Sequence, residues 1–336
     1  VYYDVTKEPF GIFGVMKPAG DSDKFRRMPA DIAKRVNEGV KMLHSNTAGG
    51  RIRFRTDSPY ISIKVQMPSV CRFPHMPLTG TSGFDIYRVS GGEQIYLSSF
   101  VPPYEMSDGY TSSCGTGDRD CETDYIINMP LYNDVSKLFV GIKRGSSLKK
   151  SVSEYKPGLP IVYYGSSITQ GGCASRPGNC YQNIISREIN RDYVNLGFSG
   201  SAMAEQEMID YIKKLDMSVF VYDYDHNAPD SEHLQKTHQP FLQAILEQQP
   251  ELPVILVSKP DYYNSVNGET AIRRDIVMKT YLWAREQGYR VGFVDGHTLF
   301  DGPLARDCTV DGCHPNDLGF YRMATKILPA LQRLLK

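Results

Sequence analysis

The sequence has no excess of charge of either sign and no long apolar run. Its 336 residues include 38 Lys and Arg against 38 Asp and Glu, so the formal net charge is zero. Phosphate binding needs a basic excess or at least a basic stripe, and the lack of both argues against nucleic acid as the main partner. A helix that spans a bilayer needs roughly 18 consecutive apolar residues. No such run occurs, so we expect no membrane insertion.

Cysteine is also sparse, and its spacing is not that of a metal site. The chain has seven cysteines, an odd number, so at least one has no partner within the chain. The spacing C-x-x-C does not occur, which weakens a zinc-site interpretation. We predict neither a metal nor a cofactor. Two pairs, Cys173 with Cys180 and Cys308 with Cys313, each flank one loop, and each pair is compatible with a disulfide or with two buried thiols.

The start of the chain lacks the marks of a secretory leader. The segment VYYDVTKEPF has neither a basic start nor an apolar stretch. The first residue is not Met, which leaves open that a leader has been removed. We therefore expect a soluble protein, with cytoplasmic and exported locations both open. The sequence does not specify the oligomeric state.

The first half, residues 1–150, has the pattern of an antiparallel β domain. Short segments such as RIRFRT and YISIKV alternate apolar and polar residues, and clusters of Gly, Pro, Ser and Asp separate them. One helix is expected over residues 29–38. Strands of this length and spacing are typical of a β-sandwich or jelly roll. We expect strands at residues 51–56, 60–65, 83–89, 93–98, 124–128 and 137–142.

The second half, residues 155–336, alternates strands with helices. This alternation predicts a parallel sheet that is covered by helices on both faces. Ligands of such sheets bind beyond the carboxyl ends of the strands, so we expect the chemistry in the loops that follow them. The expected strands are residues 160–164, 193–196, 219–222, 253–258 and 291–295. The expected helices are residues 181–190, 205–215, 239–248, 270–287 and 317–335.

Three loops after these strands carry residues suited to acyl chemistry, although each alone has a simpler explanation. YYGSSITQGG places two serines at a tight turn, where free backbone N–H groups favour a developing negative charge, but an N-cap serine explains it as well. NLGFSGS has glycines that let a backbone N–H approach a ligand. DYDHNAP offers the amide of Asn227 as a hydrogen-bond donor to an oxyanion.

A further loop, TVDGCHPND, lies before the last helix and joins two residues that can act together. The carboxylate of Asp311 can bond one imidazole nitrogen of His314 and leave the other nitrogen for a nucleophile. The alternatives are a metal-ligand pair and a turn that caps the helix.

The order of these four loops resembles that of the SGNH (GDSL-type) hydrolase family. The family's blocks match residues 165–171, residues 195–200, the segment that ends at Asn227, and residues 311–314. The resemblance covers the second half of the chain and implies a three-layer, flavodoxin-like catalytic domain. The segment GFDIY, at residues 83–87, is similar to the Gly-x-Asp-x-Tyr signature of a subgroup with a β-rich N-terminal domain.

The family register makes the two serines of the first loop unequal. Ser167 takes the place of the nucleophile, and Ser166 takes the place of the family's aspartate, whose charge a serine cannot supply. The resemblance implies a triad of Ser167, His314 and Asp311. It also implies an oxyanion hole that is formed by the backbone N–H groups of Ser167 and Gly200 and the side-chain amide of Asn227.

The substrate implied by the resemblance is a small acyl ester, acetyl above all, on a carbohydrate. The site loops are polar, with Arg176, Asn179, Asp225 and Asp230, and a lipase would need a wide apolar entrance. The candidates for substrate contact are Arg176, Asp225, Asp85 and Tyr87, of which the last two are alternatively a structural pair on one strand.

Two further readings of the sequence stay open. Tyr163, Tyr164, Tyr262 and Tyr263 suit an aromatic site around a small acyl group, with strand and core packing as an equal alternative. The function is either hydrolysis of a small-molecule or oligosaccharide ester, transfer of the acyl group to an alcohol, or non-catalytic carbohydrate binding. A complete Ser167, His314 and Asp311 set argues against the last of these.

Overall fold

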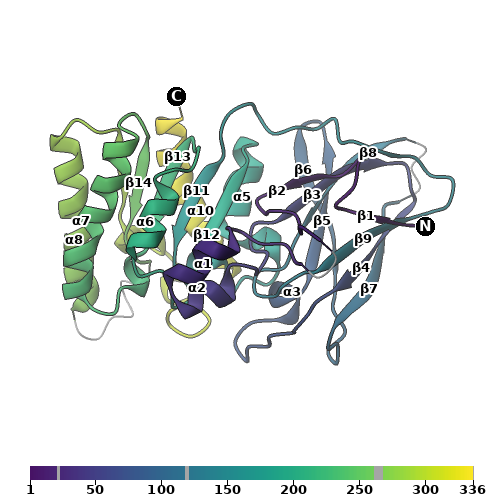
Figure 1. Cartoon of the computed structure of the whole chain (residues 1–336), viewed down its shortest axis with the longest axis horizontal. Helices are drawn as coiled ribbons and strands as arrows, with labels where there is room; N and C mark the ends of the chain where they lie inside the picture. The colour runs from purple at the N-terminus through teal and green to yellow at the C-terminus, as the bar shows by residue number, and fades with distance from the viewer. Residues whose placement is uncertain (21–22, 118–120, 261–267, 336) are drawn as a thin grey trace.

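The computed structural model describes residues 1–20, 23–117, 121–260 and 268–335. A β-rich part with the N-terminus and an α/β part with the C-terminus lie side by side along the long axis of the molecule (Figure 1). In the described ranges, no helix has the length and apolar character needed to cross a bilayer.

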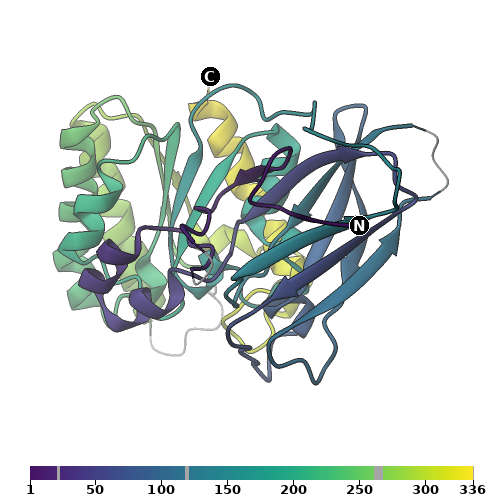
Figure 2. The same ribbon diagram turned by 45° about the vertical axis from the view of Figure 1, so that its right-hand side comes forward.

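The β-rich part consists of two antiparallel sheets, which come toward the viewer in Figure 2. One sheet has the order β1 (Tyr2–Asp4), β9 (Lys137–Ile142), β4 (Tyr60–Gln66) and β7 (Gly109–Gly115). The other has the order β10 (Leu148–Lys149), β3 (Arg51–Thr56), β8 (Thr123–Asn128), β5 (Phe84–Ser90) and β6 (Glu93–Phe100), with β2 (Gly11–Phe13) paired to β3. The predicted sandwich is confirmed.

Apolar and polar residues alternate along β4, and the apolar ones form part of the core between the two sheets. Ile61 and Ile63 are fully buried and pack with Phe54 and Phe84 from the opposite sheet. Lys64, between two inward residues, is exposed. Successive side chains of a strand point to opposite faces, so this sequence can bury only one face of its sheet.

Strand β3 has the same alternation but is buried on both faces. The apolar residues of RIRFRT face the sandwich core, while Arg51 and Arg53 are also buried. Arg51 donates from Nη2 to the carbonyl oxygen of Tyr193 at 2.6 Å and to Asp192 at 2.8 Å, and both acceptors belong to the α/β part. The polar face of this strand is thus an interface between the two halves of the chain.

The α/β part is built on a parallel sheet of five strands. Their order is β12 (Tyr193–Gly197), β11 (Ile161–Gly165), β13 (Val219–Asp223), β14 (Val254–Val257) and β15 (Val291–Val294). All four pairings are parallel, and the first strand in sequence lies second in the sheet. This is the flavodoxin-like strand order, so the predicted three-layer fold is confirmed.

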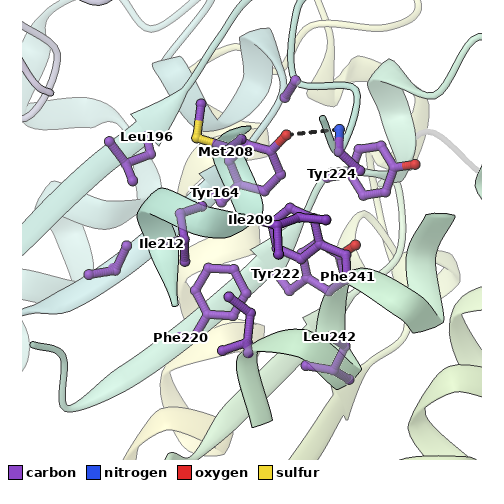
Figure 3. Packing of buried hydrophobic residues seen from close by; sticks show 14 of the residues in the cluster. Tyr164, Leu196, Met208, Ile209, Ile212, Phe220, Tyr222, Tyr224, Phe241 and Leu242 are labelled. Atoms are coloured by element: carbon purple, nitrogen blue, oxygen red, sulfur yellow. Dashed lines mark hydrogen bonds between the residues drawn. The ribbon is translucent and has the colours of Figure 1, made fainter. Parts of the chain in front are cut away.

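Helices cover both faces of this sheet. One face packs against α6 (Gln206–Ile212), α7 (Ser231–Gln248) and α8 (Glu269–Glu286), and the other against α5 (Tyr181–Ile189) and α10 (Asp317–Leu334). Tyr164, Tyr222 and Phe241 meet in the first of these cores, where Tyr164 and Phe241 stack with ring centroids 5.2 Å apart (Figure 3). The alternate residue, Tyr163, packs in the core on the other face.

Two helices from the first half of the chain also pack on the α/β part. Helices α1 (Ala30–Val36) and α2 (Glu38–Leu43) lie beside α6 and β12 in Figure 1, and Val36 and Val40 belong to the same core as Tyr164. Before them, buried Arg27 donates from Nη1 to the carbonyl oxygens of Asn195, at 3.0 Å, and Gly197. The two sequence halves therefore share a core.

The structure changes several local expectations. Helix α7 begins at Ser231, capped by Asp230, rather than at residue 239, because Pro240 lies inside the helix and does not mark its start. Strands β1, β2, β7 and β10 were not expected, since they are short or, like GYTSSCG in β7, poor in large apolar residues. All seven cysteines are free thiols, so neither candidate pair forms a disulfide.

Candidate active site

The first site loop turns sharply from β11 into the short helix α4 (Ser167–Gln170). Gly165 is required at the strand end, because a Cβ there would lie 2.1 Å from the carbonyl oxygen of Asp223. Ser166 is the N-cap of α4, and its Oγ accepts a hydrogen bond from the N–H of Ile168 at 3.1 Å. A capping role needs an acceptor oxygen but no charge, which explains how serine can occupy the position where the family has aspartate.

The second serine of this turn faces two residues from the loop before α10. Ser167 Oγ lies 3.0 Å from His314 Nε2, and His314 Nδ1 lies 2.7 Å from Asp311 Oδ2. The three predicted triad residues therefore form one continuous hydrogen-bonded chain. Both distances are within the range in which a base can take a proton from a nucleophile and a carboxylate can orient that base.

The electrostatics of Asp311 favour a charged carboxylate. Partial burial raises its pKa, but the backbone N–H of His314, the ring of His314 and the backbone N–H of Cys313 outweigh burial and lower the pKa to about 2. Oδ1 accepts the two backbone hydrogen bonds, at 2.8 Å from His314 and 3.0 Å from Cys313. One oxygen thus fixes the turn while the other orients the imidazole.

The second and third site loops are joined to one another at the predicted oxyanion residues. Asn227 donates from its side-chain Nδ2 to the carbonyl oxygen of Phe198 at 2.7 Å. Gly200, two residues further on, has a φ of +64°, a backbone conformation that favours glycine. An amide nitrogen has two N–H donors, and this bond uses one of them.

Gln170 is a site residue that the sequence did not reveal. It is fully buried at the end of α4, where Oε1 accepts from the backbone N–H of Ser199 at 3.0 Å and Nε2 donates to Asn46 Oδ1 and to the carbonyl oxygen of Leu131. One side chain therefore ties helix α4 to the second loop and to the β-rich half. Glutamine in a polar loop carries no signal for such a role.

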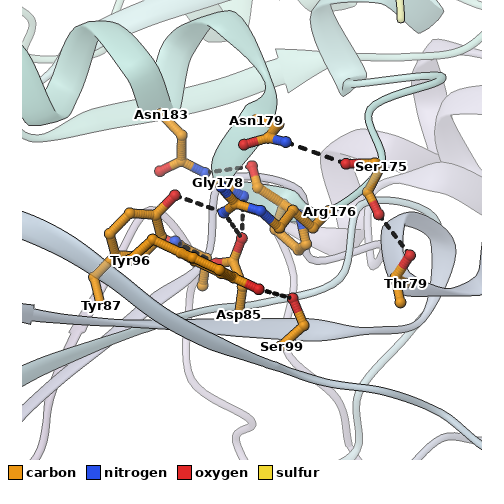
Figure 4. Close-up of polar contacts among 12 residues, drawn as sticks. Thr79, Asp85, Tyr87, Tyr96, Ser99, Ser175, Arg176, Gly178, Asn179 and Asn183 are labelled. Carbon is orange, nitrogen blue, oxygen red and sulfur yellow. Dashed lines mark hydrogen bonds and ion pairs between the residues drawn. The ribbon is translucent and has the colours of Figure 1, made fainter. Parts of the chain in front are cut away.

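Two predicted substrate contacts, Asp85 and Arg176, instead contact each other at the junction of the two halves (Figure 4). Asp85 is fully buried and accepts hydrogen bonds from Arg176 Nη1 at 2.8 Å, from the backbone N–H of Gly178 at 2.7 Å and from Asn128 at 2.6 Å. Arg176 also donates to the Tyr87 hydroxyl at 2.6 Å. These contacts favour the structural alternative for Asp85 and Tyr87.

Arg176 keeps some exposure, and its guanidinium lies 4.0 Å from the ring centroid of Tyr96. Asp225, the remaining substrate candidate, is buried, and its Oδ2 accepts from the backbone N–H of Lys259 at 3.0 Å. The backbone carbonyl of Asp225 accepts from Arg273 at 2.6 Å. Like Asp85, Asp225 directs its described contacts into the protein.

Of the two alternatives for Tyr163 and Tyr164, the structure supports strand and core packing rather than an aromatic site. Both side chains are fully buried in the sheet, where they pack on opposite faces, as alternation along β11 requires. The hydroxyl of Tyr164 accepts from the backbone N–H of Ala204 at 3.1 Å. Tyr262 and Tyr263 lie outside the described residues.

Aromatic residues of the β-rich half reach the triad in their place. The ring of His75 lies 5.5 Å from that of His314, and Phe73 contacts both His75, at 5.8 Å, and Tyr132, at 5.4 Å between ring centroids. The Tyr132 hydroxyl donates to the backbone carbonyl of Ser167 at 3.0 Å. The segment CRFPHMP around these residues follows no motif, so no local pattern predicts this contact.

Metal-binding atoms also gather around His314. In the described part of the chain, His75, Cys173 and His314 form one set, and Asp311, Cys313 and His314 another, with the atoms of each set within 4.8 Å of one another. Both ring nitrogens of His314 already have partners in the triad. Acyl transfer through a serine needs no metal, and we assign none to these sets.

Comparison with known families agrees with the fold and the order of the loops. The GDSL-like lipase/acylhydrolase family matches residues 158–332, and the N-terminal domain of SGNH hydrolase-type esterases matches residues 1–148. The chain belongs to the GDSL-like lipase/acylhydrolase family and carries the N-terminal domain of that esterase group. A search of curated proteins finds no significant match.

Solved structures share the whole architecture at low sequence identity. A GDSL-like lipase from Bacteroides ovatus is 24% identical, with a TM-score of 0.89 over 100% of this chain and 98% of that one. A salicylyl-acyltransferase from a tetracycline biosynthetic pathway is 16% identical, with a TM-score of 0.81 over 99% and 97%. A family two carbohydrate esterase from Clostridium thermocellum, in complex with cellohexaose, is 13% identical, with a TM-score of 0.63 over 86% and 93%. These likenesses show the fold.

Proposed function

We propose that this protein is a serine esterase that removes small acyl groups, acetyl above all, from a carbohydrate. The observation that carries the proposal is the chain of hydrogen bonds from Ser167 through His314 to Asp311. This geometry supplies a nucleophile, a general base within reach of it, and a carboxylate that orients the base. Membership in the family supports the same reaction class.

In the proposed reaction, Ser167 Oγ attacks the ester carbonyl carbon while His314 Nε2 takes the hydroxyl proton. The tetrahedral intermediate carries its negative charge on the former carbonyl oxygen. The ester C–O bond then breaks, and His314 gives its proton to the leaving alcohol. His314 then takes a proton from water, which attacks the acyl carbon. The bond to Ser167 Oγ breaks, His314 returns the proton to that oxygen, and the carboxylic acid is released. Asp311 stays ionised throughout and stabilises the imidazolium, which agrees with its lowered pKa.

The oxyanion would be held by the backbone N–H groups of Ser167 and Gly200 and by the amide of Asn227. Support comes from the hydrogen bond between Asn227 and the Phe198 carbonyl, which holds the amide beside the loop of Gly200. The bond between Gln170 and the Ser199 N–H holds the same loop against the helix of Ser167. Such prepositioned donors stabilise the developing charge without reorganisation during the reaction.

The carbohydrate substrate is supported by the neighbours of the fold and by the surroundings of the triad. Family two carbohydrate esterases and an acetyl xylan esterase from Butyrivibrio proteoclasticus share the architecture. The side chains that contact the triad include the ring of His75 and the hydroxyl of Tyr132.

The test is acetate release from a panel of acetylated oligosaccharides, with p-nitrophenyl acetate alongside and the Ser167→Ala protein as control. We expect the wild-type protein to release acetate from at least one sugar and the Ser167→Ala protein from none. Hydrolysis of the aryl ester alone would contradict the carbohydrate assignment. Sugar binding without any ester hydrolysis would support a non-catalytic binding protein instead.

Transfer to an alcohol is the second candidate, and the likeness to the salicylyl-acyltransferase over nearly the full length favours it. The acyl-enzyme is the same in both reactions, and only the acceptor differs. Product analysis in the presence of added alcohols separates them. A hydrolase gives mainly free acid at all alcohol concentrations tested, whereas a transferase gives mainly the new ester.

A further inference from the structure

A groove of about 550 Å³ opens in the β-rich half, in the size range of small-molecule sites. Two loops form its walls. One is the segment 72–79, which leads into the short helix α3 (Leu78–Thr81), and the other is the segment 101–104 after β6. Its lining includes Arg72, Phe73, Met76, Thr79, Val101 and Tyr104.

One wall of this groove contacts side chains that touch the triad. Phe73, in its wall, contacts the two rings that touch the reacting residues, namely His75 beside His314 and Tyr132, whose hydroxyl holds the Ser167 carbonyl. In the same wall, Thr79 Oγ1 donates to the carbonyl oxygen of Ser175 at 2.6 Å and anchors the loop to the α/β half. The groove is therefore held in a fixed position relative to Ser167.

The chemistry of the proposed reaction decides which part of an ester lies on this side. His314 must give a proton to the leaving alcohol, so the alcohol oxygen has to come within hydrogen-bond reach of its Nε2. The acyl carbon is bound to Ser167, and the alcohol part lies beyond it on the side of His314. The loop of His75 borders His314, and the groove therefore receives the alcohol part rather than the acyl part.

The lining suits a molecule with one apolar face and a polar edge. Tyr104 is 74% exposed and Val101 is 58% exposed, so both offer apolar surface to a ligand in the groove. Arg72 donates from Nη2 to the carbonyl oxygens of Tyr104, at 2.9 Å, and Met106, which leaves donors of its guanidinium for a ligand. A pyranose ring has this combination, since its C–H face can lie on an aromatic ring while its hydroxyls reach a guanidinium.

We propose that this groove, which the β-rich half provides, is the subsite for the sugar rings of the ester's alcohol part. The inference rests on the proposed esterase function. It assigns Tyr104 as the stacking platform and Arg72 as the donor to sugar hydroxyls. The β-rich half then selects the substrate, while the α/β half carries out the reaction.

The experiment compares Tyr104→Ala, Tyr104→Phe and Arg72→Ala with the wild type on two substrates, an acetylated xylotriose and p-nitrophenyl acetate. Tyr60→Ala is the matched control, because Tyr60 is an exposed tyrosine of the sandwich that does not line the groove. We expect Tyr104→Ala to raise KM for the trisaccharide about tenfold, the loss of roughly one stacking contact. Tyr104→Phe keeps the ring and restores KM, and Tyr60→Ala leaves KM for both substrates within twofold of wild type.

Each outcome bears on the proposal separately from the esterase assignment. If the wild type deacetylates the trisaccharide and Tyr104→Ala has an unchanged KM, the groove is not the sugar subsite, although the esterase assignment stands. If the wild type cleaves only the aryl ester, the sugar is overturned as occupant along with the carbohydrate substrate. Melting curves that match across the variants show that a change in KM does not come from unfolding.

Discussion

Ser166 and Ser167 are adjacent, equally small and both buried, yet the structure predicts opposite consequences when each is replaced by alanine. Ser166→Ala removes the oxygen that accepts the Ile168 N–H at 3.1 Å. Ser167→Ala removes the oxygen that lies 3.0 Å from His314. The first change acts on a helix cap, and the second acts on the proposed nucleophile.

The magnitudes follow from these contacts. Loss of an N-cap costs about 1 kcal/mol, within a range of roughly 0.5–2 kcal/mol. In a domain of this size, that lowers the melting temperature by about 2–4 °C. Because Ser166 does not touch the reacting atoms, we expect kcat to stay within about tenfold of wild type. Removal of a nucleophilic serine lowers kcat by on the order of 10⁶ while leaving no buried donor unpaired, so Ser167→Ala should melt close to wild type.

The assay is hydrolysis of p-nitrophenyl acetate, run beside thermal melts that are followed by circular dichroism. We expect the two variants to differ in opposite ways: Ser166→Ala loses stability and keeps activity, whereas Ser167→Ala loses activity and keeps stability. Two results would refute the reasoning. One is a folded Ser166→Ala protein as inactive as Ser167→Ala, and the other is a Ser167→Ala protein with more than about one hundredth of the wild-type rate.

Further predictions concern the rest of the site and the pH dependence of stability. Asn227→Ala should lower kcat by about 10²–10³ with a small change in KM, measured by steady-state kinetics. Arg176→Met leaves the buried carboxylate of Asp85 without its cation, which costs about 3–5 kcal/mol in urea unfolding, whereas a role in substrate contact would raise KM at unchanged stability. Asp311 has a lowered pKa, so its contribution to stability is present above about pH 4 and is lost toward pH 2. The stability difference between wild type and Asp311→Asn should narrow over that window. Burial lowers the pKa of His238 to about 3, so below about pH 6.5 the unfolded chain binds a proton that the folded chain does not. The free energy of unfolding therefore decreases as the pH is lowered from 6.5. His238→Gln should flatten that fall in unfolding curves at pH 7 and pH 4.5.

The parts of the fold that the sequence predicts well are those in which burial repeats with a fixed period. The strands of the parallel sheet are short apolar runs, and sandwich strands such as β3 and β4 alternate apolar with polar residues, so both follow directly from side-chain direction. Three-residue strands such as β1 and β2 have no room for a period. Arg51 and Arg53 occupy the alternate positions of β3, where the sequence pattern predicts exposure to solvent. They are buried because the second half of the chain packs on them.

The site residues also form two groups, those that the sequence predicts and those that it does not. Ser167, Asn227, Asp311 and His314 lie in loops whose order along the chain reflects the order of strands, and that order is visible in the sequence. Gln170, His75 and Tyr132 act through contacts between segments far apart in the chain, for which a single sequence has no local signal. The polar residues expected to bind substrate, Asp85 and Asp225, are polar because they join buried segments of backbone and side chain.

Helices α1 and α2 belong to the first half of the sequence but complete the core of the second. Val36, Val40 and Leu43 pack there, and burial of each such side chain contributes about 1.5–3 kcal/mol. Their sum is comparable to the whole stability of a typical domain, about 5–15 kcal/mol. A chain cut in the linker near residue 150 would lose that contribution and expose an apolar surface on the catalytic half. The two halves consequently fold as one unit. The α/β half cannot be separated from the β-rich half, or combined with another domain, unless these two helices are first replaced.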